Sequence, residues 1–220
     1  TDAISRSRTL TPQALRPAII ARLSIRADRD ESRDVMTVDP FFSEVPHAIE
    51  DLSLSVAPGE IVCVVGESGS GKSVTAQAVM GLLPRELKAD SGAIHLEGEN
   101  ILGRPPSHLR TLRGKRMSMV FQEPMTALNP VMTVGDQIAE VLEIHTPLSE
   151  RERTKRVLDI MASVHLPDPQ RILNAYPHQI SGGQRQRIMI ASALVLDPAL
   201  LIADEPTTAL DVTTQAQILR

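Results

Sequence analysis

The 220-residue sequence contains no tryptophan, one tyrosine and three phenylalanines, so a site that depends on aromatic stacking has few candidate residues. Its single cysteine, Cys63, excludes an intrachain disulfide and is typical of a reducing compartment. No apolar run approaches the roughly 18–20 residues that a membrane-spanning helix needs. The net charge of −4 provides no excess of positive charge for nucleic acid, and the basic run at 110–116 is best interpreted as a solvated face. Function must therefore be sought in local motifs.

Short apolar segments in the N-terminal half predict strands. Residues 21–27 and 48–56 alternate between apolar and polar side chains, as strands with one buried face do. Residues 61–65 form a continuous apolar run, which predicts a strand buried on both faces and an inert, buried thiol at Cys63. The pattern that follows predicts a helix over 73–83.

Between residues 123 and 180 the pattern changes to helices. Residues 133–145 place an apolar stripe on one helix face, and Ser149 and Glu152 stand at capping-box spacing before a second stripe. Strand character returns at 199–205. The sequence therefore predicts an α/β core interrupted by a helical subdomain. The expected divisions are a poorly ordered N-terminal segment at 1–20, an α/β core at 21–122 and 181–220, and a helical subdomain at 123–180.

A glycine-rich turn separates the third predicted strand from the first predicted helix. Its sequence, Gly66-x-x-x-x-Gly71-Lys72-Ser73, matches the G-x-x-x-x-G-K-[ST] pattern in the expected strand–turn–helix context. Small glycines let the backbone curl so that successive N–H groups converge on a phosphate, and the helix N-terminus adds a partial positive charge. The Lys72 ammonium would reach the β- and γ-phosphates, and the Ser73 hydroxyl would ligate Mg²⁺. The turn predicts a nucleoside triphosphate site.

The alternative interpretation is a glycine-rich turn that binds nothing. At average residue usage, the four matching positions arise by chance in a chain of this length at on the order of one in a hundred. The strand before the turn and the helix after it lower that chance further. Binding is therefore the preferred interpretation.

A second group of accessible amides is expected at 181–184. Ser181 is a good N-cap, and Gly182 and Gly183 leave their N–H groups unobstructed at the start of an apolar helical pattern. The alternative interpretation is a capped helix start with two permissive glycines, which is common.

Two carboxylates follow the apolar run Leu200–Ala203. The C-terminal end of a strand is where open α/β sheets place ligands. Because neighbouring side chains on a strand point to opposite sides, Asp204 and Glu205 should have different roles. Asp204 is suited to hold Mg²⁺, and Glu205 to orient and deprotonate the attacking water. Without the phosphate loop, the pair would be interpreted as two acids at a solvated strand end.

Together the three segments resemble a known family. "GESGSGKS", "ISGGQ" and "LLIADEP…ALD" occur in the order and spacing of the Walker A, signature and Walker B/D-loop elements of ABC-type ATPases, over roughly residues 48–220. The resemblance implies the P-loop NTPase fold, an α/β fold whose mostly parallel sheet has flanking helices, with an N-terminal antiparallel β portion and an inserted helical subdomain. It also implies that ATP and Mg²⁺ are bound. Family members work as head-to-tail pairs, in which residues 181–184 of one subunit would close over the ATP held by the other.

The resemblance also implies roles for individual residues. Gln122, in "MVFQEP", is similar to the Q-loop glutamine that contacts Mg²⁺ or the attacking water, and Asp211 is similar to the D-loop aspartate. The expected catalytic residues are Glu205, Gln122 and Lys72, and the expected magnesium ligands are Ser73, Gln122 and Asp204. The expected nucleotide contacts are Gly66, Glu67, Ser68, Gly69, Ser70, Gly71, Lys72, Ser73, Val74, Ser181, Gly182, Gly183, Gln184 and Asp211.

Two segments, "FQEPMTALNPVMTVGDQIAEVL" and "AYPHQISGGQRQR", are especially similar to the ATPase subunits of bacterial oligopeptide, dipeptide and nickel importers. This similarity implies a peripheral subunit on the cytoplasmic side of the inner membrane. Its partners would be a second ATPase domain, two membrane-spanning permease subunits and, indirectly, an extracytoplasmic solute-binding protein. One alternative is a soluble ABC ATPase of DNA repair or translation, which the acidic charge and the lack of long heptad repeats disfavour. Another is a nucleotide-binding module without turnover.

The sequence departs from the family pattern in two places. ABC ATPases carry a switch histidine after the D-loop, whereas all six histidines precede Asp204. Because the chain also ends inside an apparent helix at Arg220, we expect a truncated domain that hydrolyses ATP poorly on its own. The family stacks adenine on an aromatic residue near the first strands, and Phe41 or Phe42 is the nearest choice, although either ring is also compatible with a core position.

Overall fold

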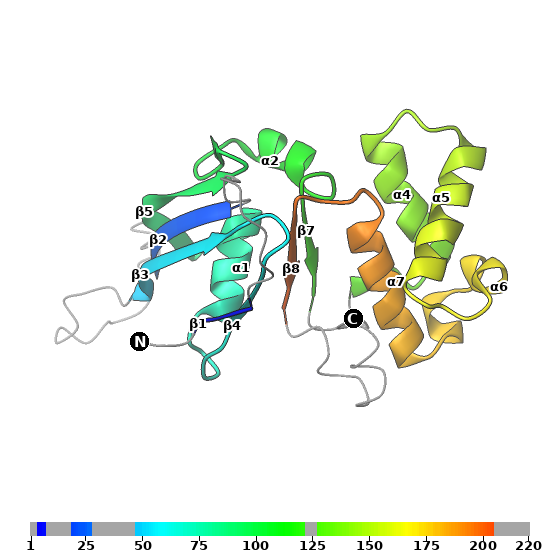
Figure 1. Ribbon diagram of the computed structural model, residues 1–220, viewed down its shortest axis with the longest axis horizontal. Coiled ribbons are helices and arrows are strands. Elements are labelled where there is room, and N and C mark those ends of the chain that lie inside the picture. The colour runs from blue at the N-terminus through cyan, green and yellow to red at the C-terminus, as the bar shows by residue number, and fades with distance from the viewer. Residues whose placement is uncertain (1–3, 8–18, 28–46, 122–126, 205–220) are drawn as a thin grey trace, which may run out of the picture. The chain divides into compact units, whose positions relative to one another are not determined.

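The computed structural model describes residues 4–7, 19–27, 47–121 and 127–204 (Figure 1). The chain divides into two compact units, Thr1–Leu109 and Arg110–Arg220, and each is described by itself. Helix α2 (Pro106–Leu112) includes the join between them. No helix in the described ranges combines the length and the apolar character that crossing a membrane would need.

The first unit contains a four-stranded antiparallel sheet in the order β3-β2-β5-β6 (Figure 1). Ile94 and Leu96 of the third strand in that order are almost completely buried, so one face of the sheet forms a core. The strands predicted at 21–27 and 48–56 are confirmed, as is an antiparallel N-terminal portion. The strands are β2 (Ile19–Ala27), β3 (His47–Val56), β5 (Leu87–Leu96) and β6 (Glu99–Asn100).

Strand β4 (Ile61–Val64) pairs antiparallel with β1 (Ile4–Ser7). A strand at 61–65 was predicted correctly, but its burial was not: Ile61 is 72% exposed, and the thiol of Cys63 is exposed rather than buried. Among the described strands β4 pairs with β1 alone, so it does not lie inside a larger sheet.

Helix α1 (Lys72–Met80) follows the glycine-rich turn and buries its last three residues, Ala78 to Met80. It ends earlier than the predicted 83 because Gly81 adopts the left-handed conformation, with φ of 62°. The amide of Gly81 then donates to the Ala78 carbonyl, and the amide of Leu82 to the Gln77 carbonyl, which satisfies the last turn of the helix.

The second unit combines a parallel pair of strands with a bundle of helices. Strands β7 (Met117–Val120) and β8 (Leu200–Ala203) pair in parallel and form a two-stranded sheet. In the apolar run at 200–203, Leu200 is buried, whereas Leu201 is 40% exposed. The helices are α4 (Val134–His145), α5 (Glu150–Ser163), α6 (Pro169–Leu173) and α7 (Gly182–Leu194), with a 3-10 turn η1 at Pro177–Gln179.

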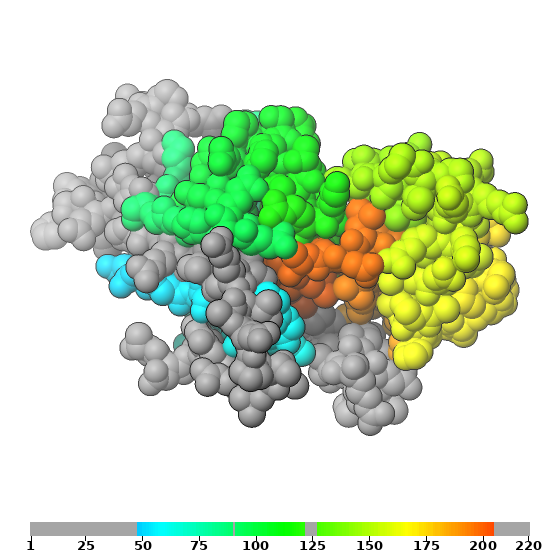
Figure 2. Space-filling view, turned by 45° about the horizontal axis from the view of Figure 1, so that its top comes forward, coloured from blue at the N-terminus to red at the C-terminus, as the bar shows by residue number. Residues whose placement is uncertain are grey.

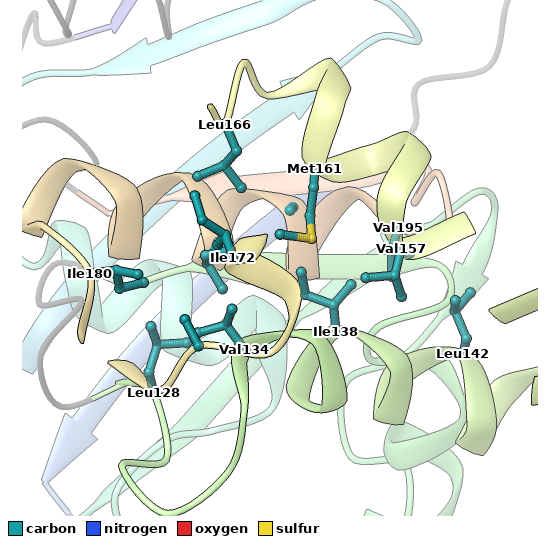
Figure 3. Close-up of a cluster of buried hydrophobic side chains, with 13 residues drawn as sticks. Leu128, Val134, Ile138, Leu142, Val157, Met161, Leu166, Ile172, Ile180 and Val195 are labelled. Atoms are coloured by element: carbon teal, nitrogen blue, oxygen red, sulfur yellow. The ribbon is translucent and has the colours of Figure 1, made fainter. Parts of the chain in front are cut away.

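Side chains from all four helices of the bundle meet in one core (Figure 3). The stripe predicted for 133–145 is confirmed, since Val134, Ile138 and Leu142 are at most 1% exposed. Val157 and Met161 of α5 are fully buried against it, which confirms the second stripe. Residues of α4 and α5 cover much of the visible surface of this bundle (Figure 2). Each of the two helices therefore packs through its apolar stripe into this core.

A single side chain, Gln137, organises the loop that precedes α4. Its Nε2 donates to the carbonyls of Asn129 at 3.0 Å and Met132 at 3.1 Å, and its Oε1 accepts from the Asn129 amide at 2.9 Å. The loop backbone thus has hydrogen-bond partners without regular secondary structure. No sequence pattern singled out this residue.

Candidate nucleotide-binding site

The loop between β4 and α1 is a tight turn that needs glycine. The amide of Ser70 donates to the carbonyl of Glu67 at 3.2 Å, which closes the turn. Gly69 and Gly71 have φ angles of 81° and 86°, a region that residues with a Cβ seldom occupy. The pattern of glycines in the sequence therefore has a conformational cause in the structure.

Close approach of neighbouring atoms also restricts two of the glycines. A Cβ on Gly71 would lie 3.0 Å from Cγ1 of Ile49 and 3.1 Å from the carbonyl oxygen of Ala48, so the end of the loop packs directly on β3. A Cβ on Gly66 would lie 2.7 Å from Oγ of Ser70. A larger residue at position 71 would therefore press on the backbone of β3, whereas one at position 66 would require the Ser70 hydroxyl to rotate away.

The Lys72 side chain turns back over the loop from the first residue of α1. Its Nζ donates to the carbonyls of Gly66 and Glu67, each at 2.8 Å, and lies 3.5 Å from Oγ of Ser70. An ammonium group can donate three hydrogen bonds and carries a full positive charge. The side chain therefore places this charge within the curve of the loop.

The start of α1 adds to the positive potential of this loop. The first turn of the helix contains no acidic residue, and Ser73 at its second position is exposed. The unsatisfied amides of a helix N-terminus favour an anion. A polyphosphate chain fits this arrangement, in which bare glycine backbone, the Lys72 ammonium and a helix N-terminus lie together. The contiguous residues expected to contact nucleotide, Gly66 through Val74, are all described and form this loop and the first turn of α1.

The second predicted segment forms a capped helix start. Ser181 Oγ accepts from the Gln184 amide at 3.2 Å, and Gln184 Oε1 accepts from the Ser181 amide at 2.9 Å. Gly182 is exposed, and a Cβ there would meet nothing closer than Nη2 of Arg185 at 3.8 Å. The N-cap prediction for Ser181 is confirmed, and the glycine amides beside it are unobstructed by side chains of their own.

Asp204 follows strand β8 and lies beside the end of β7. Its amide donates to the carbonyl of Val120 at 3.0 Å, so the parallel ladder continues to this residue, which is half-buried. Three other predicted site residues, Gln122, Glu205 and Asp211, lie outside the described residues. The two candidates for the adenine contact, Phe41 and Phe42, also do.

A cavity of about 410 Å³ opens in the second unit next to β7. Its lining combines sulfur-containing and aromatic side chains, including Met132, Met189 and Phe121, with the Gln137 carboxamide. Near it, Phe121 is 45% exposed and Val131 is 78% exposed. This surface therefore offers apolar contact area outside the phosphate loop.

Comparison with known families decides the class of the protein. Residues 49–208 match the family model described as ABC transporter. The matched range includes both glycine-containing segments and Asp204. This chain belongs to the ABC transporter family. The family resemblance seen in the sequence motifs is thereby confirmed.

Curated relatives of this ABC protein are transport ATP-binding proteins. The chain is 52% identical over 173 residues to the peptidoglycan transport ATP-binding protein YejF of Agrobacterium fabrum, covering 78% of this chain and 32% of the relative. It is 46% identical to the oligopeptide transport ATP-binding protein OppD of Lactococcus lactis subsp. cremoris, over 86% of this chain and 56% of the relative. It is 51% identical to the dipeptide transport ATP-binding protein DppD of Bacillus subtilis, over 78% of this chain and 52% of the relative. The chain spans between about a third and just over half of their lengths.

Solved structures of ABC cassettes share the fold. A dimeric post-hydrolysis state of the ATP-binding cassette MJ0796 bound to ADP and Pi has a TM-score of 0.74 and 27% identity, covering 91% of this chain and 79% of that one. A second dimeric structure of the same cassette has a TM-score of 0.73. The predicted P-loop NTPase fold is therefore confirmed for this ABC protein.

Proposed function

We propose that the chain binds and hydrolyses ATP as the nucleotide-binding part of an ABC importer. The observation that carries the proposal is the loop at 66–73, where the Lys72 ammonium lies within a curve of bare backbone at the start of a helix. This arrangement suits the β- and γ-phosphates of a nucleoside triphosphate. The membership of residues 49–208 in the ABC transporter family supports ATP as that nucleotide.

Magnesium fits the oxygen donors proposed for it. Ser73, Gln122 and Asp204 would hold the ion, which when bound neutralises charge on the phosphates. Ser73 lies in the first unit and Asp204 in the second, so the assignment rests on the family motif and on the hydroxyl, amide and carboxylate chemistry of the set. Glu205 would take the proton of the attacking water, and Asp211 would line the neighbouring interface.

We further propose that two ATPase domains, identical or paralogous, pair head to tail. Residues Ser181–Gln184 of one domain would close over ATP held at 66–73 of the other, which gives one chain two separate anion-binding surfaces. The dimeric state of the structurally similar cassette supports this arrangement. Closure with ATP and opening after hydrolysis would then shift the equilibrium between two conformations of the transporter.

The solute is proposed to be a peptide or a related small molecule. The support is that OppD and DppD, named for oligopeptide and dipeptide transport, are similar to this chain over most of its length. Two membrane-spanning permease subunits would be the partners at the cytoplasmic side of the inner membrane, served by an extracytoplasmic solute-binding protein. The exposed Phe121 and Val131 beside the cavity of the second unit supply apolar area for such a contact. The division of the chain into a core at 21–122 and 181–220 and a helical subdomain at 123–180 is part of this proposal.

Reconstitution tests the proposed function. The full-length parent protein would be placed in lipid vesicles with its permease subunits, and ATP hydrolysis would be measured with and without a loaded solute-binding protein. Peptide-dependent stimulation is expected. Hydrolysis that is indifferent to permease and peptide would instead favour a soluble ABC ATPase.

Replacing Gly182 with alanine separates folding from function at the second anion-binding surface. The substitution meets no close contact and replaces glycine in a helix, so the unfolding midpoint should stay the same or rise slightly. The methyl group would cover amides needed for the phosphate, so steady-state hydrolysis should fall by roughly tenfold or more. The measurement is a pair of thermal melts and turnover assays on the full-length protein. Full activity of Gly182→Ala would contradict the assignment of this helix start to the ATP site.

A further inference from the structure

Two helices of the second unit begin with the same arrangement of side chains. In α5 and α7 a serine, Ser149 or Ser181, is the N-cap, and the side chain of the residue three positions later accepts a hydrogen bond from the serine amide. Four positions after each serine stands an arginine whose Nη1 donates to the carbonyl just before the cap. Arg153 contacts the Leu148 carbonyl at 2.9 Å, and Arg185 contacts the Ile180 carbonyl at 2.8 Å.

The two helix starts differ in charge. The first turn of α5 contains Glu150 and Glu152, and hydrogen bonds from the Ser149 hydroxyl and amide lower the pKa of Glu152. The first turn of α7 contains no acidic residue. A guanidinium close to the positive end of a helix is unfavourable unless an anion lies nearby. The first turn of α5 itself supplies that negative charge, whereas the first turn of α7 does not.

Arg185 also makes a contact that Arg153 lacks. Its Nη1 donates a second hydrogen bond, to the Pro177 carbonyl at 3.0 Å, so one guanidinium holds both ends of the turn at 177–180. Its Nη2 lies 3.8 Å from where a Cβ on Gly182 would be, which places the charge beside the backbone of the first turn. The approach to Ser181 is therefore fixed by this side chain.

We propose that Arg185 is a positioning residue of the ATP site shared between two domains. It holds segment 177–180 against the start of α7 and so presents the Ser181 hydroxyl and the glycine amides to the phosphates of ATP bound by the second domain. The inference rests on the proposed function and deepens it. Arg185 acts through Ser181 and Gly182 and is not itself expected to touch the nucleotide.

The test compares Arg185→Met with Arg153→Met in the full-length protein. Glu205→Gln serves as background in both, so that ATP persists, and association is followed by light scattering. Arg185→Met should raise the dissociation constant of the ATP-bound dimer by about tenfold, whereas Arg153→Met should leave it unchanged. Both variants lose hydrogen bonds to carbonyls, so both unfolding midpoints should fall, and that of Arg185→Met should fall further because it loses two such bonds. In both variants the ATP affinity of the isolated monomer should equal that of the Glu205→Gln protein, because the loop at 66–73 is untouched.

Three results would decide the inference in other ways. If the Glu205→Gln protein dimerises equally well with and without Arg185→Met, the inference is overturned and the proposed function stands. If the Glu205→Gln protein itself does not dimerise in the presence of ATP, the proposed function is wrong and this inference is wrong with it. Should Arg185→Met not fold, Arg185→Lys carries the test, because an ammonium keeps the charge but lacks the planar fork. A dissociation constant raised about threefold is then expected, and an unchanged one would overturn the inference.

Discussion

Replacing Lys72 with alanine is expected to weaken Mg-ATP binding by roughly 100-fold or more. The side chain carries the charge within the loop, where its Nζ is 2.8 Å from the carbonyls of Gly66 and Glu67. Hydrogen bonds to charged groups are each worth about 1.5–3 kcal/mol, and about 1.4 kcal/mol corresponds to a tenfold change in affinity. Two such contacts to phosphate therefore account for the expected loss, which a titration with a fluorescent ATP analogue would measure.

The matched control is Lys115→Ala, which removes an exposed lysine from the second unit. It changes the net charge of the protein by the same amount and should leave ATP affinity within a factor of about two. Circular dichroism of both variants would establish that each is folded. If Lys72→Ala binds Mg-ATP as tightly as the control, the loop does not hold the phosphates and the assignment is wrong.

The second large effect is expected for Glu205→Gln. Glutamine keeps the size of the side chain but cannot accept a proton from water, so kcat should fall by about 10²–10⁴-fold. ATP affinity should be retained because the phosphate loop is intact. Single-turnover and steady-state assays of the full-length protein would measure this, with Glu143→Gln on the exposed side of α4 as the control. An unchanged kcat would show that another group activates the water.

Features that depend on near neighbours in the chain were predictable. The capping box of Ser149 and Glu152, the N-cap at Ser181 and the buried stripe of α4 follow from spacings of three or four residues, and each is present. Gly69 and Gly71 are explained in the same way, because a turn this tight requires positive φ at their positions. Local geometry and binary patterning thus determine most of both helix starts.

Features that depend on distant partners were not predictable. An apolar run predicts a strand, but whether Ile61 and Cys63 are buried depends on what covers β4, and the structure leaves both exposed. The bonds of Gln137 and Arg185 to loop carbonyls likewise depend on how turns bring those carbonyls within reach. For Arg185 a signal did exist, since the Ser-x-x-x-Arg spacing of 181–185 repeats that of 149–153.

The most direct test of the account is a crystal structure of the full-length protein with Mg²⁺ and a non-hydrolysable ATP analogue. The account predicts that the β- and γ-phosphates occupy the curve of residues 66–73, with the Lys72 ammonium turned from the loop carbonyls onto phosphate oxygens. A nucleotide bound elsewhere, with this loop making no contact to it, would contradict the account.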